Sequence, residues 1–451
     1  MPPEYLDFEL EIGLGKGREY PVAVLRSPAG EVHDVTMHFP FSELQLESRL
    51  KDLQIALRDS WGRRRLALTK EQTAVQEFGR MLFDALMTGD VRSLYDVSQK
   101  EASNKGLRIK LRIADPALAA LPWEFLYDSR RAEYICLSVH TPIVRYLELQ
   151  QSPKALAVAP PLRILGMIAS PTDLQTLDIQ KERERVEQAL AGLIADGLAE
   201  LVWLPGQTWR HLQRALRQES WHVFHFVGHG GFDELADEGL VMVCDEQGKA
   251  RPLRARELGR FLSDNRTLRL VVLNACEGAR GSDRDIFSST ASILVQRGLP
   301  AVLAMQYEIS DRAAIELARS FYESLAEGLP VDAAVAEARK SVSVAVNNTV
   351  EWGTPVLYMR APDGVLFELT ERPDISAPPP PAPPPPRHPS LTLDLTTETI
   401  AVQVSDDVTW IITVTNDGDD DLRSVSVFGG RTLLEDPFDL VSAETRHISW
   451  F

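Results

Sequence analysis

The chain has 451 residues, enough for about three domains, and its 44% hydrophobic and 25% charged residues are typical of a folded globular protein. Its 48 basic and 65 acidic side chains give a net charge of −17, which argues against a nucleic-acid-binding face, and no apolar run approaches the ~20 residues that a membrane helix needs. The first residues lack a secretory pattern and the three cysteines are too few for a disulfide scaffold, so we expect a cytoplasmic protein.

Residues 1–155 mix strand and helix patterns and form the first predicted domain. The expected strands lie at 5–12, 20–39 (a hairpin), 107–113 and 133–138, and the expected helices at 42–59 and 71–89. No group of nucleophilic or acid–base side chains stands out here. We therefore expect an α+β supporting region without catalytic residues.

Residues 156–370 alternate strands and helices with short connections and form the second predicted domain. The six expected strands lie at 162–170, 198–204, 223–230, 268–276, 299–307 and 354–360. Helices are expected at 177–196, 208–217 (with Thr208 as its N-cap), 254–262, 288–298, 311–328 and 331–346. This alternation predicts an α/β fold with a mostly parallel six-stranded sheet and helices on both faces.

A proline-rich tract at 371–389 follows this domain. Its run SAPPPPAPPPPRHP favours an extended polyproline helix and cannot pack a core. We expect a semi-rigid linker, and the alternative is a ligand for a proline-binding module.

Residues 390–451 alternate apolar and polar positions between turn signals such as Asn416-Asp417-Gly418, which predicts a β-sandwich module. Through the segments WIITVTNDGDDDL and SVSVF, the module resembles the CARDB-like adhesion modules of bacterial proteins. Such a sandwich usually needs about 80 to 100 residues, and the sequence stops at Phe451 in a strand-like run. Either the module is small, or the chain is a piece of something longer.

Two reactive side chains follow the third and fourth strands of the predicted sheet. His229 comes directly after FHFVG, and Cys276 directly after VVLNA. In an open α/β sheet, active residues lie just beyond the carboxyl ends of the strands, so neighbouring strands would bring the two together. An imidazole within hydrogen-bond reach makes a thiol nucleophilic. Gly230 and Gly231 would let the backbone turn sharply and leave an amide N–H to bind an oxyanion.

The pairing of HFVGHG with LVVLNACEG resembles the CHAT family of caspase-like cysteine peptidases, and so do LPWEFLYD, TPIVRYLEL and WGTPVLYMR. The resemblance covers about residues 75–360. It implies that His229 is the general base and Cys276 the nucleophile, and that the amides of Gly230 and Cys276 hold the oxyanion. It also implies a substrate pocket lined by Asn274, with Asp173, Gln306 and Glu308 as further candidates by position.

Each catalytic candidate has an ordinary structural alternative. Cys276 alone is typical of a small buried residue and His229 of a capping histidine, but their joint position at strand ends favours catalysis. Asp233 is close enough in sequence to orient His229, although a Cys–His dyad needs no third member. Segment 278–285 is either a solvated loop or a cleavage or activation loop.

The other histidines and cysteines are expected to be structural. His225 is interpreted as a packed or orienting residue. His222 points to the opposite strand face, which argues against a zinc site shared with His225 and His229. Buried strand residues are expected at Cys136 and Cys244, and core or docking residues at Trp123, Glu124 and Trp352.

The resemblance implies an endopeptidase that cleaves a protein partner, as a regulated bacterial effector in defence or cell-death signalling that a sensor protein activates. Its N-terminal region would be a non-catalytic, caspase-like half. No cofactor or nucleotide motif is expected. The alternatives are a non-catalytic caspase-like scaffold that binds partners and a small-molecule hydrolase with the same dyad. An acidic or neutral pocket would favour a basic or neutral residue before the scissile bond and disfavour aspartate.

Overall fold

The computed structural model describes residues 3–59, 70–147, 153–175, 177–275, 288–346, 349–370, 390–397, 410–418, 421–429 and 432–450. The chain divides into two compact units, Met1–Arg372 and Pro373–Phe451. Each unit has a hydrophobic core of its own. None of the described helices is long and apolar enough to cross a membrane.

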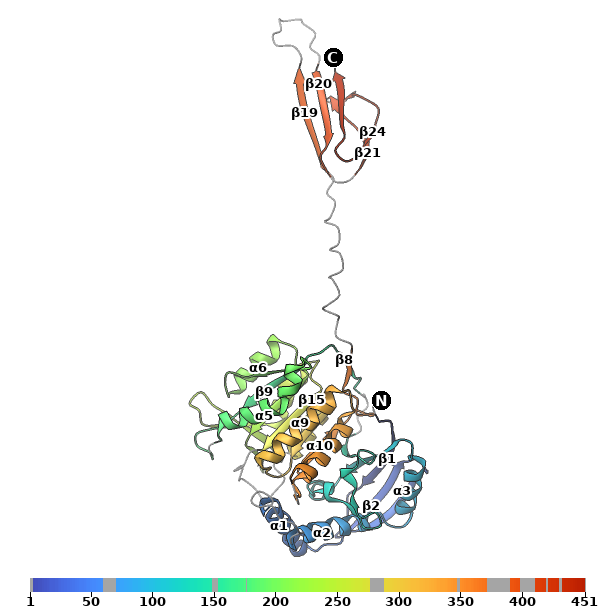
Figure 1. Ribbon diagram of the computed structural model, residues 1–451, viewed down its shortest axis with the longest axis vertical. Helices are drawn as coiled ribbons and strands as arrows, with labels where there is room; N and C mark the ends of the chain where they lie inside the picture. The colour runs from blue at the N-terminus through green and yellow to red at the C-terminus, as the bar shows by residue number, and fades with distance from the viewer. Residues whose placement is uncertain are drawn as a thin grey trace. The chain divides into compact units, whose positions relative to one another are not determined.

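The first unit is built on one large, mostly parallel sheet of eleven strands (Figure 1). In spatial order these are β10 (Ala199–Trp203), β9 (Leu162–Ile168), β11 (Val223–Gly228), β15 (Leu270–Ala275), β16 (Ala301–Met305), β17 (Pro355–Met359), β7 (Ile143–Tyr146), β4 (Gly106–Ile113), β1 (Tyr5–Ile12), β2 (Glu19–Arg26) and β3 (Val32–His38). The first six are the predicted strands, and only β17 runs antiparallel to its neighbour β16 among them. The predicted fold class is confirmed.

The same sheet continues into the N-terminal region, because β17 pairs in parallel with β7. The predicted hairpin at 20–39 is confirmed as β2 and β3. Ion pairs join the two halves: Arg108 on β4 donates to Asp332 at 2.6 Å. The Phe125 ring packs against Trp352 with ring centroids 5.2 Å apart. Residues 1–155 therefore share one sheet and one core with the six predicted strands.

Helices cover both faces of the central strands, which explains why β11 and β16 are buried along their whole length. One layer is formed by α5 (Ile179–Ala195), α9 (Asp311–Ala326) and α10 (Val331–Ala345), which pack on one another. A second group contains α6 (Trp209–Gln218), α7 (Ala255–Ser263) and α8 (Ser288–Gln296). As predicted, Thr208 is the N-cap of α6, and its hydroxyl accepts from the amide of His211.

A small antiparallel sheet separates β11 from α7, and the sequence predicted only its middle strand, through the buried strand residue Cys244. Its strands are β12 (Gly230–Asp233), β13 (Glu238–Cys244) and β14 (Ala250–Arg254). The flanking strands β12 and β14 are short and partly exposed, so they carry little apolar periodicity. This small sheet follows β11 directly in the sequence.

The helices α1 (Glu43–Asp59) and α2 (Lys70–Leu86) match the predicted N-terminal helices, and α3 (Gly89–Glu101) was not predicted. Short elements follow: α4 (Pro116–Ala119), η1 (Trp123–Phe125), β5 (Tyr127–Asp128), β6 (Glu133–Tyr134) and η2 (Ile135–Leu137). The strand predicted at 133–138 is wrong beyond Tyr134. There the chain turns into η2, whose buried apolar residues face the core without strand pairing.

A separate two-stranded sheet is formed by β8 (Leu156–Val158) and β18 (Phe367–Leu369), which pair in parallel. This pairing joins the start and the end of the segment 156–370. The chain segment beyond Thr370, including the proline-rich tract, lies outside the described residues up to Ser390.

The second unit consists of small antiparallel sheets, as a β-sandwich predicts. They are β19 (Leu391–Thr397), β20 (Trp410–Asn416) and β25 (Thr445–Trp450) in one sheet, β21 (Leu422–Val425) with β24 (Phe438–Leu440), and β22 (Phe428–Gly429) with β23 (Thr432–Leu433). The turn signal at Asn416 connects two strands, but β20 and β21 belong to different sheets and do not form a hairpin.

Candidate active site

The parallel pairing of β11 with β15 brings the two predicted catalytic segments to one edge of the sheet. Gly228, the last residue of β11, pairs with Ala275, the last residue of β15. These residues directly precede His229 and Cys276 in the sequence. His229 is only 4% exposed. Cys276 and segment 278–285, for which the solvated loop and the cleavage or activation loop are the two alternatives, lie outside the described residues.

The imidazole of His229 is oriented by a backbone carbonyl. Its Nε2 lies 2.8 Å from the carbonyl oxygen of Gln175. A carbonyl oxygen can only accept a hydrogen bond, so Nε2 carries the proton and donates it. The lone pair of the neutral ring is therefore on Nδ1, which is the atom able to accept a proton from a thiol.

The loop that carries Gln175 is fastened at several points. The hydroxyl of Ser170 accepts from the amide of Leu177 at 2.9 Å, which closes the loop at its base. Thr172 donates its amide to the carbonyl of Gly248 at 2.9 Å. Asp173, a predicted pocket residue, accepts from the amide of Ala250 at 2.6 Å. These bonds tie the loop after β9 to the turn between β13 and β14 and so hold the Gln175 carbonyl in place.

The suggestion that Asp233 orients His229 is wrong. The Asp233 carboxylate pairs with Arg254 at 2.7 Å and accepts from the amides of Leu235 and Ala236. The hydrogen bond from Arg254 lowers the pKa of Asp233. Sequence reasoning overlooked Gln175 because it acts through its main chain, which leaves no side-chain signal.

The backbone of Gly230 is also placed by pairing. Met242 donates its amide to the carbonyl of His229, so these two residues form a hydrogen-bonded pair of the antiparallel ladder. The next pair, Gly230 with Val241, is then of the non-hydrogen-bonded kind, and the Gly230 N–H points away from β13. Gly230 and Gly231 lie in the extended strand β12 rather than in the expected sharp turn.

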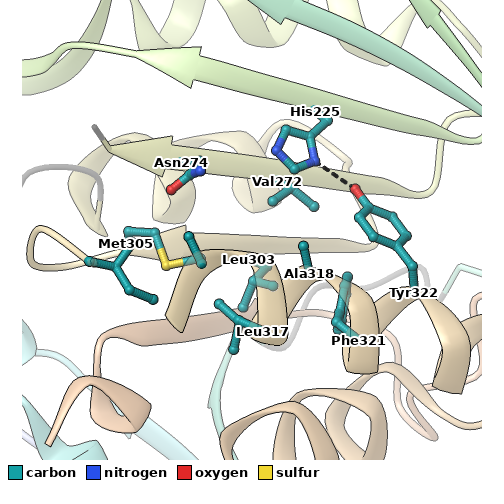
Figure 2. A pocket seen from close by; sticks show the side chains of 11 residues that line it. His225, Val272, Asn274, Leu303, Met305, Leu317, Ala318, Phe321 and Tyr322 are labelled. Atoms are coloured by element: carbon teal, nitrogen blue, oxygen red, sulfur yellow. Dashed lines mark hydrogen bonds between the residues drawn. The ribbon is translucent and has the colours of Figure 1, made fainter. Parts of the chain in front are cut away.

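Two polar side chains face a small cavity beneath this edge, between the sheet and α9 (Figure 2). His225 is 2% exposed, and its Nδ1 lies 2.8 Å from the hydroxyl of Tyr322. Its Nε2 has no hydrogen-bond partner among the described residues, and neither has Oδ1 of Asn274. Burial lowers the pKa of His225 to about 4. His225 is therefore a packed neutral residue, as interpreted from the sequence, and Asn274 lies beside it.

The other predicted pocket residues, Asp173, Gln306 and Glu308, are not among the residues that line this cavity. Gln306 is 2% exposed and donates its side-chain amide to the carbonyl of Gly353 at 2.8 Å and to Glu124 at 3.3 Å. Glu124 is in turn paired with Arg145 at 2.9 Å. Glu308 is half-buried in the segment that follows. The structure brings Asn274 together with His225, and it directs Gln306 toward the N-terminal half of the sheet.

The two described cysteines are buried free thiols. Cys136 lies in η2, not in a strand, and burial raises its pKa to about 12. Cys244 lies on β13, and burial also raises its pKa. Neither thiol ionises readily near neutral pH, so neither has the reactivity of a catalytic cysteine.

His222 makes a structural hydrogen bond. Its Nδ1 accepts from the amide of Arg163 at 3.0 Å, and burial lowers its pKa to about 4. Trp123 and Trp352 are fully buried core residues, as expected. Among the described residues, no three histidine, cysteine or acidic side chains come together as metal ligands.

The chain was compared with protein-family models, curated proteins and solved structures. The family model described as CHAT domain matches residues 76–360. The structure is similar to the Arg-specific cysteine proteinase gingipain R, at 11% identity and a TM-score of 0.39 over 88% of this chain and 89% of that chain. It is also similar to the Saccharomyces cerevisiae separase–securin complex, at 12% identity and a TM-score of 0.40 over 81% of this chain and 30% of that chain. No curated protein matches the chain.

Proposed function

The chain belongs to the CHAT domain family, whose model matches more than half of its residues, and we propose that it is a caspase-like cysteine endopeptidase with His229 and Cys276 as its catalytic dyad. The observation that carries the proposal is the hydrogen bond from His229 Nε2 to the Gln175 carbonyl. It fixes the tautomer in which Nδ1 is free to act as a base. The pairing of Gly228 with Ala275, one residue before each member, supports the proximity of the dyad.

The proposed reaction proceeds through an acyl-enzyme. The thiol proton of Cys276 moves to His229 Nδ1, and the sulfur bonds to the carbonyl carbon of the scissile peptide. The resulting oxyanion accepts hydrogen bonds from the amides of Gly230 and Cys276. The intermediate collapses, the C–N bond breaks, and the leaving amine takes the proton from His229. A water molecule, deprotonated by His229, then attacks the thioester and releases the acid and the thiol.

The substrate is a protein, and the reaction is regulated. On this proposal the chain acts in the cytoplasm, where the free thiols of Cys136 and Cys244 remain reduced. It serves as an effector in bacterial defence or cell-death signalling, and a sensor protein activates it, in keeping with the family resemblance. The second unit, as a CARDB-like module, binds the partner or the substrate.

The dyad is tested by single substitutions. Cys276→Ala is expected to abolish cleavage, and His229→Ala to lower kcat/KM by about 10²–10⁴, since the base is lost while the fold is kept. His140→Ala is the matched control, because His140 is exposed and far from β11 in the sequence. Thermal melting of all three variants reports whether the fold is kept. Unchanged cleavage by the Cys276 variant would refute the proposal.

The alternative of a non-catalytic scaffold predicts a different result. A thiol-reactive peptide probe is expected to label the wild-type chain and not the Cys276→Ala variant, which retains Cys136 and Cys244 as buried internal controls. A scaffold would show no selective labelling and would bind its partner equally well with either residue at 276. Terminal labelling of a proteome exposed to the wild type and to this variant identifies the substrate.

A further inference from the structure

The cavity lined by His225 and Asn274 is small and mostly apolar. Its volume is about 20 Å³, room for a water-sized group. It lies between the middle of β11, β15 and β16 on one side and α9 on the other, and it extends to Asn274 and Met305 near the carboxyl ends of β15 and β16 (Figure 2). Its lining on α9 includes Ala314 and Ala318, whose short side chains leave this space open.

The cavity presents one hydrogen-bond donor and one acceptor. The phenol of Tyr322 is buried, and its hydroxyl has a hydrogen that needs an acceptor; the Nδ1 of His225 is the atom within 2.8 Å. Donation to Nδ1 leaves the proton of the neutral imidazole on Nε2, which becomes the donor. The acceptor is Oδ1 of Asn274, and neither atom has a partner among the described residues.

Among the described residues, no charged side chain lines this cavity. Its walls are apolar apart from His225, Asn274 and the hydroxyl of Tyr322. Because His225 stays neutral at pH 7, a carboxylate would find no cation here, and an ammonium or guanidinium group would find no anion. The described walls therefore disfavour the side chains of aspartate, glutamate, lysine and arginine.

The walls can adapt to an unbranched side chain. Leu303 and Met305 on β16 line the cavity, and Leu303 pairs with Val272 at the level of His225. Methionine has three rotatable side-chain bonds and repacks easily, so the cavity can enlarge at this wall. An incoming chain of methylene groups would lie against Met305 while its end reaches Asn274.

We propose that this cavity receives the side chain of the residue before the scissile bond and that it selects glutamine. This inference rests on the proposed peptidase function, since Asn274 precedes the proposed nucleophile Cys276 by two residues in the sequence. The carboxamide oxygen of glutamine accepts from His225 Nε2, and its NH₂ donates to Asn274 Oδ1. Asparagine is one methylene shorter and reaches less far. The sequence predicted a basic or neutral substrate residue before the scissile bond, and the uncharged cavity restricts this prediction to a neutral residue.

The direct test is a set of peptides that differ only in the residue before the scissile bond. Glutamine is expected to exceed glutamate, methionine and arginine by at least tenfold in kcat/KM, because each of the three lacks a carboxamide or adds a charge. Efficient cleavage after arginine or aspartate would overturn the inference while leaving the peptidase function intact.

Substitutions of Asn274 separate recognition from folding. Asn274→Asp keeps the size of the side chain and adds a negative charge, so preference is expected to move from glutamine toward lysine and arginine. Asn274→Leu removes the acceptor and is expected to raise KM for the glutamine peptide more than it lowers kcat. An unchanged preference in both variants, with melting temperatures that match the wild type, would exclude Asn274 from recognition.

A binding measurement keeps the inference independent of catalysis. In the Cys276→Ala variant, fluorescence polarisation is expected to show the glutamine peptide binding at least tenfold more tightly than its glutamate counterpart, with the difference lost when Asn274→Leu is added. If no peptide is cleaved and no probe labels Cys276, the peptidase function fails, and this binding difference still decides whether the cavity selects a glutamine side chain. Equal binding of the two peptides would overturn it.

Discussion

At the scale of single residues, the position of His229 is decided by a main-chain atom. A carboxylate such as Asp233 would have stabilised a charged imidazolium, whereas the Gln175 carbonyl fixes the tautomer and adds no full charge. With Nε2 directed at this carbonyl, Nδ1 is the ring nitrogen that can take a proton from a thiol. The Gln175 carbonyl is held in position because its loop is closed by the hydrogen bond between Ser170 and Leu177 and is bonded to the turn at Gly248.

Substituting Asp233 distinguishes the two ways of orienting the histidine. Asp233→Asn keeps the side-chain shape and removes the ion pair with Arg254, which lies away from His229. We expect kcat/KM to remain within about threefold of the wild type, in contrast to the His229→Ala variant. The measurement is steady-state cleavage of one peptide by both variants, and a loss of two orders of magnitude in Asp233→Asn would restore Asp233 to the site.

The buried His225 makes stability depend on pH. Desolvation lowers the pKa of His225 from 6.5 to about 4, so the folded chain binds this proton only at a lower pH than the unfolded chain does. This contribution to the free energy of unfolding is complete above pH 6.5 and is lost as the pH falls toward 4, by up to about 1.4 kcal/mol per pH unit.

Urea unfolding at pH 7.5, 6.5, 5.5 and 4.5 measures this effect. The His225→Phe variant removes the titrating ring, so its free energy of unfolding is expected to fall less steeply below pH 6.5 than that of the wild type. The exposed His140→Ala variant serves as the control and is expected to follow the wild type. Parallel curves for wild type and His225→Phe would contradict the assignment.

At the scale of elements, close approaches decide which substitutions a helix tolerates. Helix α2 packs directly against η1, and a Cβ placed on Gly79 would lie 1.9 Å from the carbonyl oxygen of Phe125. In α5, a Cβ on Gly192 would meet no atom within 4 Å. Both glycines lie inside helices, so sequence alone predicts the same effect for both.

Alanine substitutions at these positions are expected to act in opposite directions. Gly192→Ala is expected to stabilise the chain by about 0.5–1 kcal/mol, because alanine loses less backbone entropy in a helix. Gly79→Ala is expected to destabilise it by about 1–3 kcal/mol, because the backbone of η1 has to shift. Denaturant unfolding of the two variants checks the pair, and stabilisation by Gly79→Ala would show that α2 and η1 do not pack so closely.

At the scale of the whole molecule, the chain consists of two compact units, Met1–Arg372 and Pro373–Phe451. The first contains the complete sheet and all the described residues of the proposed site. The second has its own small core, which includes Ile412, Val414, Leu440 and Ile448. Independent cores predict that the first unit can fold without the second.

Removing residues 373–451 tests this independence. The shortened chain is expected to fold, and its kcat/KM for a short peptide is expected to stay within about twofold of the full chain. Cleavage of a folded protein substrate is expected to weaken if the second unit recruits it, because tethering raises local concentration. Equal rates on both kinds of substrate would remove the recruiting role, and loss of peptide cleavage would show that the second unit supports catalysis.

The alternation of strands and helices could be read from the sequence because each element carries its own periodicity. Most of the flanking helices and the N-cap at Thr208 are local features, and so are the six strands β9, β10, β11, β15, β16 and β17. The sequence did not predict the short strands β12 and β14 or the turn of η2 after Tyr134. Their backbone pairing and burial come from distant segments of the chain.

The sequence by itself determined the fold class and nominated His229 and Cys276, because both follow strongly apolar strands at a recognisable spacing. Only the tertiary structure decided that β7 joins β17 and that the sheet therefore has eleven strands. It also decided that the Gln175 carbonyl, and not Asp233, holds His229. The physical reason is the same in both cases: main-chain hydrogen bonds between segments far apart in the chain carry no signature in side-chain identity.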